Sequence, residues 1–522
     1  MVRKMSFFLT KLWQRKDKPS VNTDVIDDSL QSIFLSEIRS AIKWLLDIQD
    51  SQTGGWGWIQ HIPPNEQNTA EVVYALLLFL QEDLYRKDES RFLVEKRIQY
   101  IARGIVHFLI KVEEHAKLSI DWIWVLRALL QLKTYWNRTP DYDPIKNSLN
   151  DALEKELEKE CYTGYQAEQA IDAAIANCIQ WLLKNQGDQG AWSDTETGPP
   201  NIIRTAFTIY TIADGGRALG ERFAEVKPVI ERAAYWLVQV QRKDGGWGCI
   251  PEPYNTATFP PIQLPEIDDQ ENSNPAATAY ALLALGALNP QVFKKSIRRG
   301  MQWLINNRDR NTGGWPVFRE VGIRNGNVFT FRHFSTAWTL AALLKVNPDI
   351  ILSTDTHEAL QYLLTLQDPY AGGWRTSSDA DPTTWASVNA VETLLSLENT
   401  FHNIGGLRFS KLVAEWRKMK MEKEVEVIKL LGIPFAFNYP MSILFSSFFT
   451  AVLFSIVGGV MFFDWSKLVR SILCSGLTII ASIPWIVHFV KFKFNEWSSA
   501  LQLVGLFIGF ILAVILGLIA LL

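Results

Sequence analysis

The sequence predicts an all-α protein: an α/α6 toroid of six helical-hairpin repeats, followed by a helical stalk and three transmembrane helices. Two observations predict this fold class. A motif of an apolar helical stretch, a Gly-rich turn and a tryptophan recurs between residues 44 and 374, and long apolar runs begin after Pro440. The predicted parts are a basic N-terminal segment at 1–30, the toroid at 31–405, the stalk at 406–434 and a membrane domain at 440–522.

The net charge argues against a nucleic-acid partner, and the N-terminal segment allows two interpretations. The 522 residues carry 52 basic and 55 acidic side chains, so the net charge predicts no nucleic-acid partner. The first 20 residues are basic with a short apolar patch, and two interpretations remain: an amphipathic foot on an anionic membrane, or a solvated end. The cysteines lack the spacing of metal ligands, so we predict buried thiols in a reducing compartment, no metal and no cofactor; they are Cys161, Cys178, Cys249 and Cys474.

Five copies of the repeat are evident in the sequence. Each is followed by a loop and a second apolar helix. The distance from Trp56 to Trp192 is about twice that between the later copies, which indicates a sixth, degenerate copy at Gly104–Leu132 that has lost its Gly-Gly-Trp turn. The five clear copies are Trp44–Trp58, Trp181–Trp192, Trp236–Gly248, Trp303–Trp315 and Tyr362–Trp374.

The two helices of each repeat have different compositions. The second helices are rich in Ala and Leu and carry little charge, so we expect them to form an inner ring. The first helices carry charges such as Lys43, Lys184 and Arg298 and should lie outside. Glycine allows each tight turn, and Gln with Trp should attach each turn to its neighbour. Six units without a polar capping repeat at either end favour closure of the ring over an open solenoid.

The last part of the chain has the composition of membrane helices. Three apolar runs, Met441–Phe463, Leu468–Val490 and Ala500–Leu522, are each long enough to cross a bilayer. Basic residues are more numerous on the toroid side, which predicts an integral membrane protein with a cytoplasmic toroid. The stalk before them has helix-forming composition and stops at Gly432 and Pro434; an amphipathic helix that binds a protein partner is the alternative interpretation.

The Q-x-x-x-G-x-W turns, followed by T-A-x-x-x-x-A-L helices, resemble the repeats of squalene–hopene and oxidosqualene cyclases and of protein prenyltransferase beta subunits. The resemblance spans about Ile33 to Leu397. It implies a central apolar cavity that binds an isoprenoid or other apolar lipid and, if the protein is an enzyme, class II terpene cyclisation. Two departures are visible: this chain has one toroid where the squalene cyclases have two, and the zinc ligands of the prenyltransferases have no counterpart.

The resemblance also suggests a candidate acid. Class II cyclases protonate an alkene with the middle aspartate of a D-x-D-D-T-A motif, which must be buried and kept neutral by a second acid. In "SDADPTTWAS" this pattern makes Asp381 the proton donor and Asp379 its partner, with Pro382 in place of the last Asp. Alignment with Asn274-Pro275 instead makes Asp381-Pro382 the start of a helix. Both interpretations remain open.

Side chains of the inner helices are the candidate ligand contacts. They either line an isoprenoid pocket, where aromatic rings would stabilise carbocations through cation–π attraction, or form an ordinary core. Two functions therefore remain. One is a membrane-anchored, terpene-cyclase-like toroid that binds and cyclises an isoprenoid; the other is a non-catalytic binding toroid coupled to a transmembrane sensor, scaffold or effector. The candidate contacts are Tyr74, Tyr210, Tyr280, His333, Trp338 and Trp385.

Overall fold

The computed structural model describes most of the repeat region. The described residues are 34–81, 91–115, 118–141, 143–160, 166–194, 199–251, 272–324, 327–377 and 380–404. The predicted N-terminal segment at 1–30 lies outside them. Along these ranges the chain is helical, apart from one pair of strands.

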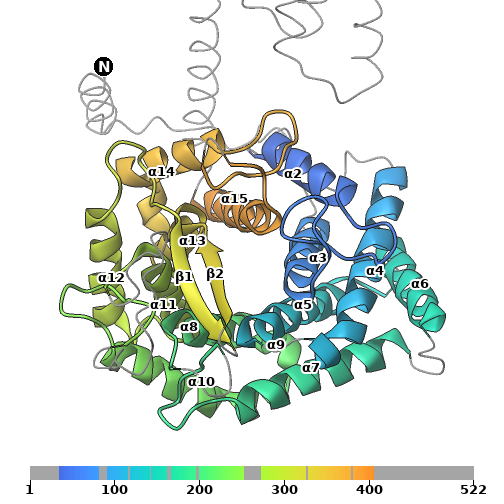
Figure 1. The fold of residues 1–522 in the computed structure, drawn as a ribbon, viewed down its shortest axis with the longest axis horizontal. Helices are drawn as coiled ribbons and strands as arrows, with labels where there is room; N and C mark the ends of the chain where they lie inside the picture. The colour runs from blue at the N-terminus through green and yellow to red at the C-terminus, as the bar shows by residue number, and fades with distance from the viewer. Residues whose placement is uncertain are drawn as a thin grey trace, which may run out of the picture.

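The second helices of the repeats form a closed inner ring. Each contacts the next along the chain, and the last, α15, contacts the first, α3 (Figure 1). These helices are buried on most sides, because one face packs on the outer helices and the other on the ring interior; every residue of α11 from Ala276 to Leu285 is buried. Ring closure is confirmed. In the described chain the inner helices are α3 (Glu66–Gln81), α5 (Ser119–Arg138), α8 (Ile202–Asp214), α11 (Pro275–Leu288), α13 (Ser335–Val346) and α15 (Thr384–Ile404).

The first helices of the repeats lie around this ring (Figure 1). They are amphipathic, as predicted: α12 buries Ile297, Trp303 and Leu304. The pair α4–α5 is the degenerate sixth copy. The outer helices are α2 (Leu35–Asp47), α4 (Arg91–His115), α7 (Ala167–Lys184), α10 (Arg222–Gln239), α12 (Lys294–Asn306) and α14 (Thr354–Thr365), with α6 (Pro144–Lys159), α9 (Gly216–Leu219) and η3 (Pro348–Leu352) as shorter or additional elements.

The turn tryptophans connect each outer helix to its inner partner. The indole Nε1 of Trp56 donates to the Leu45 carbonyl at 2.6 Å, and that of Trp374 donates to Leu363 at 2.9 Å. The backbone N–H of each turn tryptophan donates to a hydroxyl near the start of the next inner helix. We call this group the marker hydroxyl, because it lies at an equivalent position in five copies. The marker hydroxyls belong to Thr69, Thr205, Thr278, Thr336 and Ser387.

Glutamine links the repeat to the next in four of the five clear copies, as predicted, and Arg308 takes its place in the copy that ends at Trp315. Gln49 Nε2 donates to Gly54 in its own turn at 2.7 Å and to Tyr100 on α4 at 3.0 Å. In the last copy, Gln367 Nε2 donates to Gly372 and to Glu37 on α2, both at 2.8 Å. The same contact that joins consecutive repeats therefore also joins the last repeat to the first.

A β-hairpin that was not predicted crosses one face of the ring. Strands β1 (Phe318–Arg324) and β2 (Asn327–His333) pair antiparallel, between α12 and α13. The hairpin lies over the face at which the inner helices begin (Figure 1). The all-α prediction is corrected by this element. Its signal was present, because Asn325-Gly326 lies between residues of high strand propensity, which is typical of a two-residue hairpin turn.

The predicted membrane domain is also corrected. None of the helices in the described ranges is long and apolar enough to cross a membrane. Helix α4 has 25 residues, but charged side chains such as Lys96 and Lys111 interrupt it. The predicted spans at 441–463, 468–490 and 500–522, and the stalk at 406–434, lie outside the described residues. The prediction of an integral membrane protein, with a toroid followed by three transmembrane helices, is therefore corrected. The described chain is a toroid with a β-hairpin across one face of the ring.

Candidate ligand-binding interior of the ring

An aromatic layer fills the ring just inside the hairpin. The Trp124 ring lies 4.8 Å from Phe207 and 6.4 Å from Trp338, measured between centroids, and Tyr280 lies 4.5 Å from Trp338. Trp124 belongs to α5 and Trp338 to α13, on opposite sides of the ring. Rings from opposite helices therefore meet at the centre. In the copies with a marker hydroxyl, these residues lie two positions after it.

A polar layer lies one helical turn further in. The Arg127 guanidinium is ion-paired with the Glu392 carboxylate, and both side chains are buried. Tyr74 Oη accepts from Arg127 Nη2 at 2.7 Å and donates to Glu392 Oε1 at 3.1 Å. Tyr210 Oη lies 3.5 Å from the same oxygen. Burial raises the pKa of both tyrosines, so the phenols stay protonated. Four helices, α3, α5, α8 and α15, contribute to this layer.

The Arg127 guanidinium also occupies an aromatic cage. Its central carbon lies 4.5 Å from the Tyr74 ring centroid and 4.4 Å from that of Tyr210, with Trp124 and Phe207 at 5.8 and 5.5 Å. In a cyclase these ring faces would stabilise a carbocation. In this chain the Arg127 guanidinium, which is a cation, contacts these ring faces.

Some polar atoms in this layer have no hydrogen-bond partner among the described residues. They are Nε and Nη1 of Arg127 and Oε2 of Glu392. Buried polar atoms in native proteins are normally paired with protein, water or ligand. The ion pair therefore still has donors and an acceptor for a further group.

A charged cluster fastens the hairpin over the aromatic layer. Glu320 of β1 accepts from Arg204 Nη2 of α8 at 3.0 Å, lies 2.8 Å from His333 Nε2 and also accepts from Asn201. Burial alone would raise the Glu320 pKa, but these partners outweigh it and hold the pKa at about 2. The His333 ring packs edge-on against Tyr280, with 5.7 Å between centroids.

The predicted binding residues come together only in part. Tyr74, Tyr210, Tyr280 and Trp338 are buried inside the ring, and His333 lies at its mouth. Trp385 is half-buried near the start of α15.

Of the predicted acid pair, the structure describes only Asp381, and it does not lie in this interior. Asp381 is exposed, and Asp379 lies outside the described residues. The exposed carboxyl has none of the burial that a proton donor to an alkene needs. Asp381 is not a helix cap either. The backbone N–H groups of Thr383 and Thr384 donate to the carbonyls of Trp374 and Trp58, and α15 begins at Thr384 with the Thr383 hydroxyl as its cap.

The marker hydroxyls give a structure-based register for the cyclase motif, with the threonine of the motif matched to the hydroxyl. In D-x-D-D-T-A the middle aspartate lies two residues before the threonine. At that position none of the five marked copies in the described chain has an acid. The residues found there are Gln67, Ile203, Ala276, Phe334 and Trp385.

Besides Glu320 and Glu392, sequence reasoning missed a further buried acid, Glu71 on α3. It lies two residues after Thr69, the position at which other copies contribute the aromatic layer. Gln67 Nε2 and Asn68 Nδ2 donate to its oxygens at 2.8 and 3.2 Å. Burial, with a smaller contribution from Asp121, nevertheless raises its pKa to about 7. The available signal was a charged residue inside an otherwise apolar inner helix.

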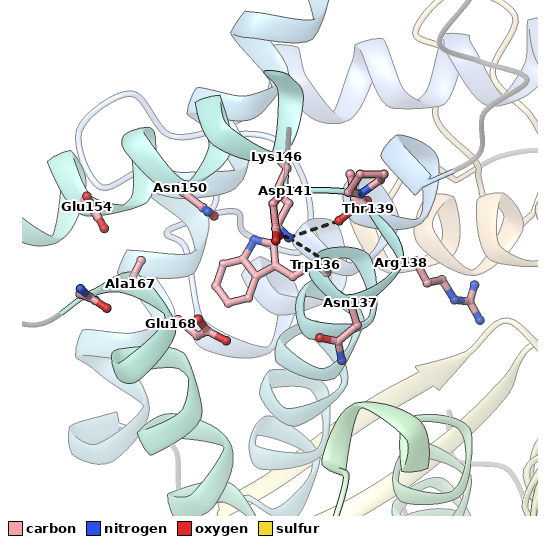
Figure 2. Close-up of a pocket in the computed structure, with 12 residues that line it drawn as sticks. Trp136, Asn137, Arg138, Thr139, Asp141, Lys146, Asn150, Glu154, Ala167 and Glu168 are labelled. Atoms are coloured by element: carbon pink, nitrogen blue, oxygen red, sulfur yellow. Dashed lines mark hydrogen bonds and ion pairs between the residues drawn. The ribbon is translucent and has the colours of Figure 1, made fainter. Parts of the chain in front are cut away.

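One surface pocket lies away from the interior. It has a volume of about 740 Å³ and is bounded by the end of α5 and by α6 and α7 (Figure 2). Its lysine, Lys146, already donates to the carbonyls of Trp136 and Thr139 and to Asp141, at 3.1, 3.2 and 2.6 Å. The pocket includes none of the predicted residues. The described chain has no group of three His, Cys, Asp or Glu side chains that could hold a metal.

The family comparisons agree with this ring. The family "Squalene-hopene cyclase C-terminal domain" matches residues 160–348, and "Prenyltransferase alpha-alpha toroid domain" matches residues 328–425. The toroid is squalene-cyclase-like. Squalene–hopene cyclase of Bradyrhizobium diazoefficiens is 28% identical over 32% of this chain and 24% of its own length, and lanosterol synthase of Saccharomyces cerevisiae is 28% identical over 31% and 20%. These matches support the predicted superfamily.

The coverage of these relatives is limited. The chain spans about a quarter or less of the length of these curated relatives, down to 12% of a terpene cyclase–glycosyl transferase fusion protein of Humicola fuscoatra. Among solved structures, an apo type II terpene cyclase from Scytonema is similar at a TM-score of 0.40 and 14% identity, over 70% of this chain and 98% of that one. An α-1,6-mannanase from Salegentibacter is similar at 0.44 and 11%, over 70% and 99%.

Proposed function

We propose that this toroid binds an isoprenoid or similar apolar chain inside its ring and does not cyclise it with the acid of the cyclase motif. One observation carries the proposal. An aromatic layer lies directly above buried polar atoms that have no partner among the described residues, inside a squalene-cyclase-like ring. The first part provides an apolar contact surface, and the second provides hydrogen bonds for a ligand. The five marked copies in the described part of the chain have no acid at the motif position, and this supports binding without cyclisation by such an acid.

The aromatic layer must open for a ligand to enter. Trp124 and Trp338 meet at the centre, so a chain would displace at least one of them. Trp338→Ala removes one ring and should leave an apolar cavity, which apolar guests can occupy. We expect this variant to retain more squalene than the wild type.

The test uses the purified full-length chain. Protein is equilibrated with squalene in detergent micelles, washed, extracted, and the retained lipid is quantified by chromatography. Trp181→Ala is the matched control, because Trp181 stacks on Trp122 outside the ring interior, with centroids 5.3 Å apart. Retention that rises in Trp338→Ala but not in the control supports the proposal. No retention by the wild type or by Trp338→Ala would reject it.

A second candidate function rests on Glu71. A buried carboxylic acid with a pKa of about 7 is largely protonated below neutral pH, and it lies beside the aromatic layer. It could donate its proton to one carbon of an isoprenoid double bond, which leaves a cation on the other carbon for attack by the next double bond; a base must take a proton at the end. A cyclic product formed by the wild type and lost in Glu71→Gln would favour this function. Absence of product from the wild type would exclude it.

A further inference from the structure

The Arg127–Glu392 ion pair inside the ring already binds one hydroxyl group, that of Tyr74. Tyr74 Oη accepts a hydrogen bond from Arg127 and donates one to Glu392, at 2.7 and 3.1 Å. A hydroxyl can do both at once, because it is a donor and an acceptor. The Tyr74 side chain thereby uses Nη2 of the arginine and Oε1 of the glutamate.

The pair has further polar atoms of both kinds, donors and an acceptor. Nε and Nη1 of Arg127 are donors without a partner, and Oε2 of Glu392 is an acceptor without one, among the residues that the structure describes. Both side chains are more than nine-tenths buried. A buried group that offers donors and an acceptor is complementary to a ligand that has both.

The charge of the pair restricts the ligand further. Arginine and carboxylate cancel, so the layer presents no net charge to a guest. A diphosphate or carboxylate would meet the Glu392 carboxylate, and an ammonium group would meet the Arg127 guanidinium; each contact is unfavourable in a poorly solvated interior. A neutral hydroxyl avoids both costs.

The aromatic layer lies about one helical turn above the pair, since its residues precede those of the polar layer by three positions. We infer that the Arg127–Glu392 pair binds the hydroxyl of an isoprenoid alcohol whose chain lies against the aromatic layer. This inference rests on the proposed function, and it names the ligand class of the same interior. It predicts that a hydrocarbon or a diphosphate of the same chain type binds less well.

The experiment compares three probes on the full-length chain: geranylgeraniol, geranylgeranyl diphosphate and squalene. For the wild type we expect geranylgeraniol to bind about tenfold more tightly than the diphosphate, and more tightly than squalene. Glu392→Gln leaves Arg127 unneutralised, so we expect the preference between alcohol and diphosphate to invert. The matched control is Glu398→Gln, because Glu398 is a buried carboxylate on the same helix that accepts from the backbone N–H of Phe34 at 2.7 Å.

Arg127→Lys is the second variant, should Glu392→Gln fail to fold. It keeps the positive charge and loses the Nε donor, so we expect the advantage of geranylgeraniol over squalene to shrink. Equal binding of alcohol and squalene by the wild type, or an unchanged preference in the folded Glu392→Gln and Arg127→Lys variants, would overturn the inference and leave the proposed function standing. Binding of none of the three probes would reject both.

Discussion

Closure of the ring depends on a close contact between the last turn and the first helix. Gly372 has φ +88°, and a Cβ at this position would lie 2.6 Å from the Ser40 carbonyl oxygen on α2. That oxygen belongs to the backbone and cannot move aside cheaply. Gly372→Ala should therefore strain the turn and push the last repeat away from the first.

Gly190 is a matched control for the backbone strain. It occupies the equivalent turn in another copy with the same φ of +88°, but its Cβ would meet only the flexible Arg232 side chain, at 3.0 Å. Positive φ costs alanine about 1–2 kcal/mol at either site. Overpacking against backbone adds about 1–3 kcal/mol at Gly372 alone. We therefore expect Gly372→Ala to lose about 2–5 kcal/mol and Gly190→Ala about 1–2 kcal/mol.

The assay combines thermal unfolding with hydrogen exchange. For a ring of this size, about 1–2 °C of unfolding temperature corresponds to 1 kcal/mol, so Gly372→Ala should show the clearly larger decrease. Amide exchange of α2 should increase in Gly372→Ala and stay near wild type in Gly190→Ala. Equal unfolding temperatures, with no change in exchange of α2, would refute the reasoning about closure.

Two further predictions concern the buried charges. Because the Glu71 pKa is raised to about 7 in the folded chain from an ordinary value near 4.5, its contribution to stability is full below pH 4.5 and is lost as the pH rises through 7, a change of about 3 kcal/mol. Unfolding temperatures of Glu71→Gln should lack this component between pH 5 and 8, and an unchanged pH profile would contradict the assigned pKa. Arg127→Met leaves Glu392 as an unpaired buried charge and should cost about 3–5 kcal/mol, as measured by thermal unfolding. The double variant Arg127→Met/Glu392→Gln should recover part of this loss, and additive losses would argue against the pairing.

The repeat pattern made the ring predictable, because local features recur in it. The Trp, Gln and Gly positions of each turn follow from the sequence spacing, and the contacts of Trp56 and Gln367 match that prediction. The alternating apolar and charged helices likewise identified the inner and outer rings.

The interior was less predictable, because its contacts join helices far apart in the sequence. Arg127 and Glu392 are separated by 265 positions, and Arg127 lies on the copy that has lost its turn, so no turn tryptophan marks its register. Glu71 follows an ordinary Thr-Ala start, and it differs from its equally buried counterparts by carrying a carboxyl group. Asp381 matches the D-x-D spacing of the motif, but its side chain is exposed, and a local match in sequence does not report burial.

The central claim is that the toroid binds an isoprenoid without protonating it. Incubation of the full-length chain with squalene and geranylgeraniol in deuterium oxide tests it directly, because protonation followed by cyclisation would place deuterium on carbon. The extracted lipids are analysed by chromatography and mass spectrometry. The account predicts retained lipids with unchanged retention times and no incorporated deuterium. A cyclic, deuterium-labelled product would contradict it.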